Sequence, residues 1–540
     1  MRYAPLNFGI FQRLTRPQCS WNPDTEASRP FTKQYIESLR VKVKSLESQI
    51  AELQNLSLTP SAGPHPNTPA SSSLSQESLE DFQIPPSPHT SLSDPLSSII
   101  NPEFLNSSSF YSSGSRAFPS LPAFEYQYIF NIDLSLPFER QTPETQASLS
   151  CQWNRHLPNL GRDLSRIEHD VILSRYFNHG TSWLSGLVPS LFLRDMINYL
   201  SPPPTTTATH MDNYSPLIHC SLMASASALS EDTYIRAKEV RVKFATQAKN
   251  WLFDQFGNFH PTLLPSLALL AEYHTTIGER HTGYMYLGMG VRAARTVPIS
   301  ANNLAYTWYS WSIYVQEAFS ALESGRPNQM LPPRVPIDYP TEHSGDYSSL
   351  EAETFVRTCK LAVIAMDING NTSNDSSSIA ELQSLLDAWY NLLPHRLLIH
   401  QHAAFTHPHV FCLHIAYWWI TLRLHFPLYR KARTEDSDVG SDEDRSVSAC
   451  NRATDVLVEL FGEFHKRYNL RSFPENLLQA ITLCGDTLLF KRNLTLDEAL
   501  DERVKAQEGI DSCVRALQTV GETWSHALNL AVEFQARVAS

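Results

Sequence analysis

From about residue 160 to the end of the 540-residue chain, apolar and aromatic side chains recur at the three- and four-residue spacing of α-helices. The stretches "RYFNHGTSWLSGLVPSLFLRDMINYL" and "VRVKFATQAKNWLFDQF" both follow this period, and no run of short alternating strands lies between them. With 42% hydrophobic residues, the chain has enough apolar side chains for a large core. The pattern predicts an all-α domain over residues 161–430 that continues in residues 448–540.

Two features divide this helical region. In "TLLPSLALLAEYHTTIGERHTGYMYLGMGVRAAR", Gly278 predicts the end of one helix and the start of the next. The second helix carries small residues that would let a neighbouring helix approach closely, namely Gly288, Gly290, Ala293 and Ala294. The tract "TEDSDVGSDEDRS" at 434–446 contains six acidic residues and little apolar content. It predicts a solvated acidic loop over residues 431–447.

Residues 57–122 have a different composition from the helical region. Serine and proline fill 30 of these 66 positions, with a single arginine and no lysine. Such a segment cannot bury enough apolar surface to offset the conformational entropy that it would lose on ordering. We therefore predict a disordered Ser/Pro-rich linker over residues 57–160.

Residues 32–56 read as one helix, with Thr32 at its N-cap. Its apolar residues alternate at spacings of three and four, which places β-branched side chains at the a positions and leucines at the d positions. The a positions are Ile36, Val43 and Ile50, and the d positions are Leu39, Leu46 and Leu53. Lys42 and Glu47 would meet across a parallel dimer, so the pattern predicts a short two-stranded parallel coiled coil and a homodimer. The alternative is an amphipathic helix packed on its own chain.

Charge is unevenly distributed along the chain. The net charge is −12, yet residues 1–50 contain eight Lys or Arg and four Asp or Glu, so this end is positive and the remainder strongly negative. An acidic body excludes a protein that coats nucleic acid generally, whereas a basic arm suits contact with DNA at one end. The candidate phosphate contacts are Arg13, Arg16, Arg29 and Lys33.

The eight cysteines are widely spread, and no two have the C-x-x-C spacing of a metal or redox motif. This predicts reduced, mostly buried cysteines in a cytosolic or nuclear protein. The N-terminus has no apolar signal core. The most apolar helix, near "LHIAYWWITLRLHF", is interrupted by Arg423, and we expect it to be too short to span a membrane.

The text "CSWNPDTEASRPFTKQYIESLRVKVKSLESQ" joins an isolated Cys19 to a basic segment and the heptad helix. It resembles the junction after the DNA-binding module of fungal Zn(2)-Cys(6) binuclear cluster transcription factors. In that family six thiolates hold two zinc ions and a coiled coil dimerises the protein. The resemblance implies that Cys19 is the last of the six ligands and that residues 1–31 are a remnant of the cluster and its linker. One thiolate cannot build a zinc site, so we expect no zinc on this chain as given. Either an upstream exon is missing or the cluster has been lost.

Later phrases extend the resemblance over nearly 400 residues. "YSPLIHCSLMASASALSED", "GYMYLGMGVRAAR", "YTWYSWSIYVQEAFSALESGRPNQM", "LHIAYWWITLRLHFPLY" and "CVRALQTVGETWSHALNLAVEF" follow one another in this order. They resemble segments of the fungal-specific (xylanolytic-activator-type) regulatory domain, most closely in its nitrate-assimilation branch. The usual arginine after the histidine of the long helix is here Phe426, which puts a polar contact at that point in doubt.

The motif residues Gly325, Arg326 and Pro327 also have a physical interpretation. Gly325 can end a helix in a left-handed conformation, and Pro327 prevents the helix from continuing. Arg326 at the helix C-terminus would interact favourably with exposed carbonyl groups. We favour capping or packing at the core edge for Arg326, with contact to a ligand as the alternative.

Two patterns could indicate chemistry. His407 and His409 flank a proline among seven histidines between residues 395 and 425, but no carboxylate completes a metal-ligand set at a usable spacing. We expect surface or hydrogen-bonded histidines there. Asp442-Glu443-Asp444 could suggest a magnesium-dependent terpenoid synthase, but it lies in a Ser-rich acidic tract. No nucleophile–base pair or phosphate-binding loop occurs, so we do not expect an enzyme.

The resemblance implies a nuclear regulator of RNA polymerase II-dependent transcription that contacts DNA. It also implies control of the helical domain by a small-molecule effector or a corepressor. The alternative is a helical dimerisation protein without DNA binding of its own, which modulates a related transcription factor. Nothing in the sequence indicates a membrane partner.

Overall fold

The computed structural model describes part of the chain. The described residues are Lys44, 150–180, 182–201, 211–257, 259–296, 304–335, 337, 350–370, 376–399, 406–434, 441–494 and 500–539. The chain divides into two compact units, Met1–Ser91 and Leu92–Ser540. In the first unit only Lys44 is described, as an exposed helical residue. The predicted cluster remnant, the rest of the coiled coil and most of the linker therefore lie outside the described residues and stay predictions.

Every regular element in the described part of the second unit is a helix, and these ranges contain no strand. The prediction of an all-α fold is confirmed for this part. The main helices are α4 (Arg166–His179), α5 (Ser182–Ser185), α6 (Pro189–Leu200), α7 (Pro216–Ala226), α8 (Thr233–Arg236), α9 (Lys238–Gln255), α10 (Leu263–Thr276), α11 (Arg280–Thr296), α12 (Leu304–Ser324), α13 (Leu350–Gly370), α14 (Ser376–Asn391), α15 (Pro408–Thr434), α16 (Ser441–Tyr468), α17 (Leu478–Leu494), α18 (Leu500–Val520) and α19 (Ser525–Ala539).

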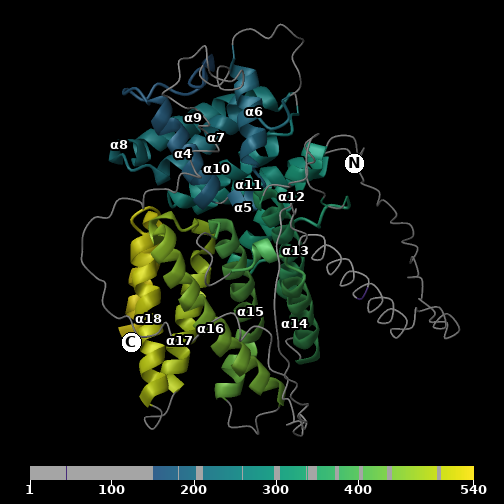
Figure 1. The fold of residues 1–540 in the computed structure, drawn as a ribbon, viewed down its shortest axis with the longest axis vertical. Coiled ribbons are helices and arrows are strands. Elements are labelled where there is room, and N and C mark those ends of the chain that lie inside the picture. The colour runs from purple at the N-terminus through teal and green to yellow at the C-terminus, as the bar shows by residue number, and fades with distance from the viewer. Residues whose placement is uncertain are drawn as a thin grey trace, which may run out of the picture. The chain divides into compact units, whose positions relative to one another are not determined.

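Helix α7 is the centre of the first group of helices, drawn in blue and teal in Figure 1. It packs against α4, α9 and α10, and every one of its residues is buried. The side chains of α7 itself are small or apolar on nearly every side, as expected for a helix that other helices enclose. Its N-terminus is well defined, because the Ser215 hydroxyl accepts a hydrogen bond from the backbone N–H of Ile218 at 3.3 Å, and Pro216 occupies the first turn.

Helices α10 and α11 form a tight antiparallel pair. Gly278 has a φ of +85° between them, as the sequence predicted. A Cβ atom at Gly283 would lie 2.5 Å from the hydroxyl of Thr275, and one at Gly290 would lie 2.8 Å from Ile313 of α12. Gly290 thus has its predicted role. Gly288 does not, because the space around it is open, and the sequence analysis missed Gly283.

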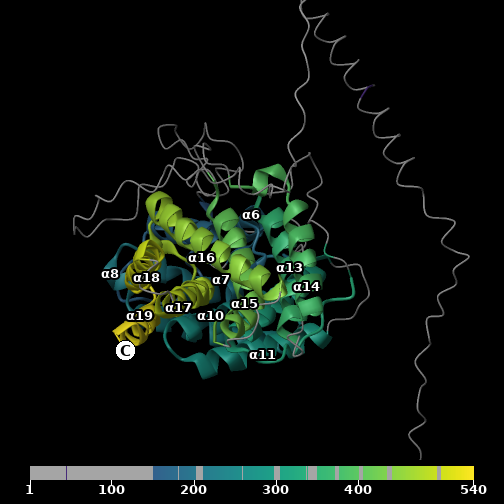
Figure 2. The same ribbon diagram turned by 90° about the horizontal axis from the view of Figure 1, so that it is seen from below.

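The second group consists of the longer helices from α13 to α19. Helix α15 packs on α13, α14, α16 and α17, while α18 packs on α17 and α19. Figures 1 and 2 show α15, α16, α17 and α18 side by side in two perpendicular views. Helix α12 connects the groups, since it contacts α10 and α11 on one side and α13 on the other. A shared apolar core extends from Cys151 to Phe534.

The folded domain begins earlier than the predicted boundary at residue 161. Cys151 is 5% exposed and Leu160 is 4% exposed, and both belong to the core. The backbone N–H of Gln152 donates to the carbonyl of Leu200 at 3.0 Å. The linker prediction is therefore wrong for residues 150–160. Their anchors lie about 50 residues away in sequence, so local composition could not reveal them.

The acidic loop is shorter than the predicted 431–447. Helix α15 continues to Thr434, and α16 begins at Ser441. Acidic residues are favoured in a first helical turn, because they interact with the positive end of the helix dipole. The buried Ser446 adds a tertiary anchor, since its hydroxyl lies 3.1 Å from Nδ1 of His425 in α15.

Helix α15 has 27 residues and is therefore longer than the apolar stretch near "LHIAYWWITLRLHF" suggested. Across the described residues, no helix contains an apolar stretch long enough to cross a membrane.

Candidate functional site

The Gly325-Arg326-Pro327 sequence closes the C-terminus of α12. Gly325 has a φ of +64°, and its N–H donates to the carbonyl of Leu322 at 3.4 Å. The N–H of Arg326 donates to the carbonyl of Ala321 at 3.1 Å. This pair of bonds is the Schellman arrangement that glycine makes possible, and Pro327 cannot extend the helix. The predicted helix end is confirmed.

The side chain of Arg326 folds back onto α12. Its Nη1 and Nη2 atoms donate to the two carboxylate oxygens of Glu317 at 2.5 and 2.9 Å, and Nη2 also donates to the hydroxyl of Ser320 at 3.1 Å. The guanidinium lies 4.8 Å from the ring centre of Tyr284. Arg326 therefore packs at the core edge, as favoured, but its main partner is a carboxylate rather than the helix carbonyls.

The surroundings of the Arg326–Glu317 pair strengthen the interaction between the two side chains. Glu317 is 1% exposed, and one of its oxygens also accepts the backbone N–H of Gln329 at 3.0 Å. Burial alone would lower the pKa of Arg326, but the hydrogen bonds and charge of Glu317 raise it above its usual value. Arg326 therefore keeps its charge, and its bonds to Glu317 hold the chain after α12 against that helix.

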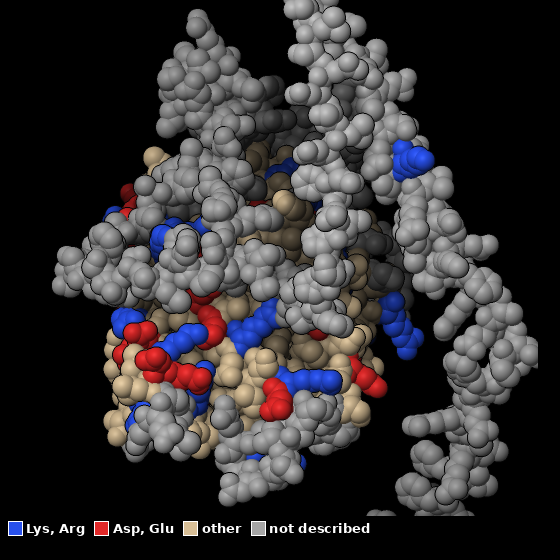
Figure 3. All heavy atoms as spheres, turned by 60° about the horizontal axis from the view of Figure 1, so that its bottom comes forward, with Lys and Arg blue, Asp and Glu red and all other residues tan. Residues whose placement is uncertain are grey.

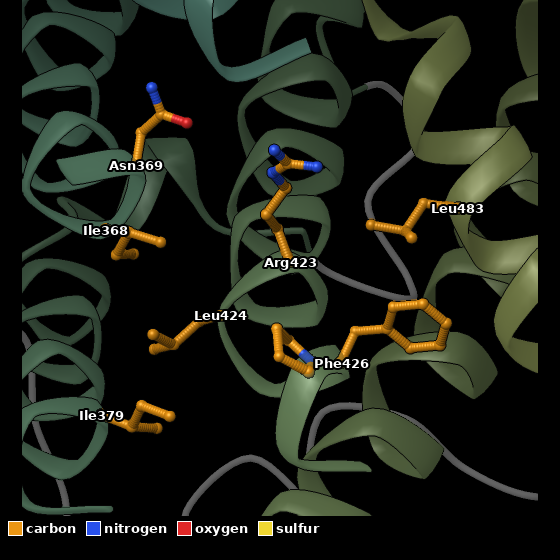
Figure 4. Close-up of a pocket in the computed structure, with 8 residues that line it drawn as sticks. Ile368, Asn369, Ile379, Arg423, Leu424, Phe426 and Leu483 are labelled. Atoms are coloured by element: carbon orange, nitrogen blue, oxygen red, sulfur yellow. The ribbon is translucent and has the colours of Figure 1, made fainter. Parts of the chain in front are cut away.

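A cavity of about 240 Å³ lies between helices α13, α14, α15 and α17. It is lined by Ile368, Asn369, Ile379, Arg423, Leu424, Phe426, Pro427 and Leu483. Figure 4 shows the polar ends of Asn369 and Arg423 at one end of this cavity, with Ile379, Leu424 and Phe426 at the other. The cavity thus has a polar end and an apolar end.

Arg423 brings a positive charge to the polar end. It lies in the middle of α15, and its Nη2 would be 3.3 Å from a Cβ atom at Gly325. Among the described residues it has no hydrogen-bond or ion-pair partner. Burial lowers the pKa of Arg423, and no carboxylate within the described part of the chain counteracts that effect. Pro427, one turn later, cannot donate the backbone hydrogen bond that would reach the carbonyl of Arg423.

Asn369 lies in the last turn of α13 and is oriented by the turn after α12. Its Nδ2 donates to the backbone carbonyl of Arg326 at 2.7 Å. The amide oxygen and the second N–H of Nδ2 are left, and Figure 4 shows the amide oxygen on the side of Arg423. The Gly-Arg-Pro turn and the cavity are in this way parts of one local structure.

Phe426 contributes to the apolar end of the cavity. Its ring centre lies 6.4 Å from those of Tyr429 and Phe490. The resemblance placed an arginine at this position, and the sequence analysis questioned a polar contact there. The aromatic surroundings suit the phenyl ring that this chain has instead.

The histidines near the Pro408 turn are hydrogen-bonded inside the domain. His407, His409, His414 and His425 are all buried, and each imidazole has an uncharged hydrogen-bond partner; His407 Nε2 also lies 3.8 Å from a carboxylate oxygen of Glu351. These partners are Asn178 for His407 at 3.0 Å, Ser182 for His409 at 2.9 Å, the Leu397 carbonyl for His414 at 2.9 Å, and Gln383 and Ser446 for His425 at 3.0 and 3.1 Å. Burial lowers the pKa of His414 to about 4, so its imidazole is neutral. For these four, the prediction of hydrogen-bonded histidines is confirmed.

A buried polar chain connects α4 to α7, and the sequence analysis missed it. The carboxylate of Asp170 can only accept, so His169 Nδ1 donates to it at 2.6 Å. His169 Nε2 must then accept from His219 Nε2 at 2.8 Å, and His219 Nδ1 accepts from the hydroxyl of Tyr214 at 3.1 Å. All four side chains are at most 1% exposed. The chain therefore stabilises the helix packing and offers no surface to a substrate.

Tyr214 and His219 both belong to the phrase "YSPLIHCSLMASASALSED". The spacing of these two residues in the phrase was the sequence feature that could have indicated the polar chain. His169, the partner of His219, lies 50 residues earlier, so the sequence alone did not identify it.

The cysteines do not form a metal site in the described ranges. Seven of the eight lie there, and all seven are free and buried, as predicted. No group of three potential metal ligands occurs among the described residues. Cys19 lies outside these ranges, as do the predicted phosphate contacts and the heptad positions, namely Arg13, Arg16, Arg29, Lys33, Ile36, Leu39, Val43, Leu46, Ile50 and Leu53.

Charges of both signs alternate on the described surface. On the face drawn in Figure 3, blue and red side chains are interspersed outside the grey regions. Exposed pairs such as Lys505–Asp455 at 2.8 Å and Arg537–Asp486 at 2.9 Å show the same mixture. The described part of this face shows no continuous basic surface for a nucleic acid.

The chain was compared with known proteins at three levels. No family model matches it, no curated protein matches it, and no solved structure matches it. Any functional conclusion therefore depends on the residues and geometry described above.

Proposed function

We propose that this chain is a nuclear transcription regulator of the fungal zinc-cluster class, acting on RNA polymerase II-dependent genes. In this proposal the helical unit is its regulatory domain, and residues 36–53 dimerise it. The domain responds to a small-molecule effector or a corepressor.

The observation that carries this proposal is the Gly-Arg-Pro turn together with the adjoining cavity. The motif residues of the resemblance close α12 through Glu317, and Asn369 connects the turn to a cavity that contains Arg423. A cavity with one charged end, held by a rigid turn, suits ligand sensing.

Zinc does not fit this chain. A binuclear cluster needs six thiolates, and seven of the eight cysteines are buried in the helical unit. Cys19 alone cannot complete a zinc site. DNA contact by this chain would then depend on Arg13, Arg16, Arg29 and Lys33, and four phosphate contacts support only weak, salt-dependent binding.

A tethered reporter assay tests the regulatory proposal. The full chain is fused to a heterologous DNA-binding module, and transcript from a promoter with the matching site is measured against the module alone. We expect a several-fold change in transcript. Unchanged transcript, together with exclusion of the tagged chain from the nucleus, would overturn the proposal.

The second candidate is a dimerisation protein that modulates a related transcription factor without binding DNA itself. The heptad of residues 36–53, which would pair this chain with a related factor, favours it. Gel-shift assays of the full chain at 50 and 200 mM salt, with and without a chelator, separate the two. Weak binding that salt abolishes supports phosphate contacts, whereas no binding at either salt supports the modulator. Specific, chelator-sensitive binding would contradict our conclusion about zinc.

A further inference from the structure

Arg423 and Arg326 lie on either side of the Gly325 turn, yet their environments differ. Arg326 has a bidentate carboxylate partner in Glu317, whereas Arg423 has no partner among the described residues. A partly buried charge without a counter-ion destabilises a fold. Residues that keep such a cost are concentrated at functional sites. The lack of a counter-ion for Arg423 among the described residues is therefore the first indication of a ligand.

The lining of the cavity restricts what that ligand can be. Apart from Asn369 and Arg423, every lining side chain is apolar, and no carboxylate is among them, which disfavours a cation. A single guanidinium balances a single negative charge. The amide oxygen of Asn369, which lies on the side of Arg423 in Figure 4, would repel a second anionic group. The cavity volume of about 240 Å³ is below the about 300–1,000 Å³ typical of pockets for drug-sized molecules.

We infer that this cavity binds a small organic monocarboxylate with an apolar body. The carboxylate forms a bidentate pair with Arg423, whose planar fork matches it. The apolar body lies against Leu424, Phe426 and Ile379, at the end away from the guanidinium. This inference rests on the proposed function only in treating the ligand as an effector. Binding itself can be measured without any transcriptional readout.

Direct binding to the full chain tests the inference. Hexanoate and benzoate are the probes, and hexanamide is the uncharged control, with calorimetry and thermal shift as readouts. We expect both carboxylates to bind and to raise the melting temperature, and hexanamide to do neither. In Arg423→Gln the carboxylate affinity should fall about tenfold or more. Lys431→Gln, which removes an exposed charge from the same helix, should bind like the wild type.

Two further measurements keep the test decisive if Arg423→Gln binds weakly for another reason. Without ligand, Arg423→Gln should melt at or above the wild-type temperature, because it removes an unpaired charge. Leu483→Trp, which narrows the cavity without touching Arg423, should also abolish binding. Equal carboxylate binding by wild type and Arg423→Gln would overturn the inference, as would no binding to the wild type at millimolar concentration. A lower melting temperature for Arg423→Gln would equally overturn it, since Arg423 would then be structural.

Failure of the two proposals can be distinguished. If the carboxylates bind but the tethered reporter does not respond, the cavity is a ligand site and the regulatory function is wrong. If the reporter responds but the carboxylates do not bind, the regulatory function stands and the ligand assignment fails.

Discussion

The ion pair between Arg326 and Glu317 shows how one side chain can hold a turn in place. Glu317 is 1% exposed and depends on Arg326 and on the N–H of Gln329 for its hydrogen bonds. Removing the arginine leaves a buried carboxylate with little compensation. Breaking a buried pair in this way is costly, whereas replacing both partners costs much less.

Arg326→Ala should therefore lower the free energy of unfolding by about 3 kcal/mol. The measurement is urea unfolding followed by circular dichroism. The matched control is Glu317→Gln combined with Arg326→Gln, which should lose clearly less than the sum of the two single variants. A loss below about 1 kcal/mol for Arg326→Ala would mean that water or another group replaces the arginine.

His414 gives a pH prediction at the same scale. Burial lowers its folded-state pKa to about 4, while the unfolded chain binds the proton near pH 6.5. The unfolded state therefore holds more protons between these values, so stability falls as pH drops from about 6.5 towards 4. His414→Gln should reduce this slope by up to about 1.4 kcal/mol per pH unit.

The pH measurement is urea unfolding at pH 7, 6 and 5. The exposed His281, changed to Gln, serves as the control for the loss of an imidazole. Glu475 acts in the opposite direction, since burial raises its pKa to about 8 and its folded form keeps a proton that the unfolded chain loses. An unchanged slope in His414→Gln would show that this histidine is not kept neutral by the fold.

At the scale of helices, the glycines of α11 differ in their roles although they look alike in sequence. A Cβ atom at Gly283 would lie 2.5 Å from the Thr275 hydroxyl and 2.7 Å from the Ala271 carbonyl. Nothing lies within 4 Å of one at Gly288. Close approach of α10 and α11 thus requires glycine at one position and tolerates a side chain at the other.

Two alanine variants test this difference. Gly283→Ala should destabilise the domain by about 1–3 kcal/mol, because α10 must move away. Gly288→Ala should stabilise it by about 0.5–1 kcal/mol, because alanine favours the helix and meets no neighbour. Melting temperatures of the two variants provide the comparison. Equal effects would mean that α10 and α11 are not packed as described.

At the scale of the whole molecule, dimerisation is the prediction that the described residues leave open. Replacing Leu39 and Leu46 with Lys puts charges at two d positions and should convert a dimer to a monomer. Replacing Ser38 and Ser45 with Lys adds the same charge at outward c positions and should preserve the dimer. Sedimentation equilibrium measures both. A wild-type monomer, or a dimer that persists in the Leu39/Leu46 variant, would contradict the coiled coil.

Local sequence predicted the features that depend on local geometry. The 3.6-residue period predicted an all-α domain, because apolar side chains at that spacing lie on one face of a helix, which can then be buried. Gly278 and Gly325 predicted helix ends, because glycine adopts positive φ without steric cost. Burial of the seven described cysteines was predicted from their wide spacing, which forms no metal or redox motif.

Tertiary packing decided the features that join distant segments. His169 meets His219 from 50 positions away, and Asn369 reaches the carbonyl of Arg326 from 43 positions away. In the sequence, Arg423 interrupts an apolar helix. In the fold, it lies at one end of a cavity between four helices. A sequence determines which face of a helix is buried, but which residue faces another is decided only when the helices pack. The helices of this protein could therefore be predicted from its sequence, whereas its candidate ligand site could be found only in the fold.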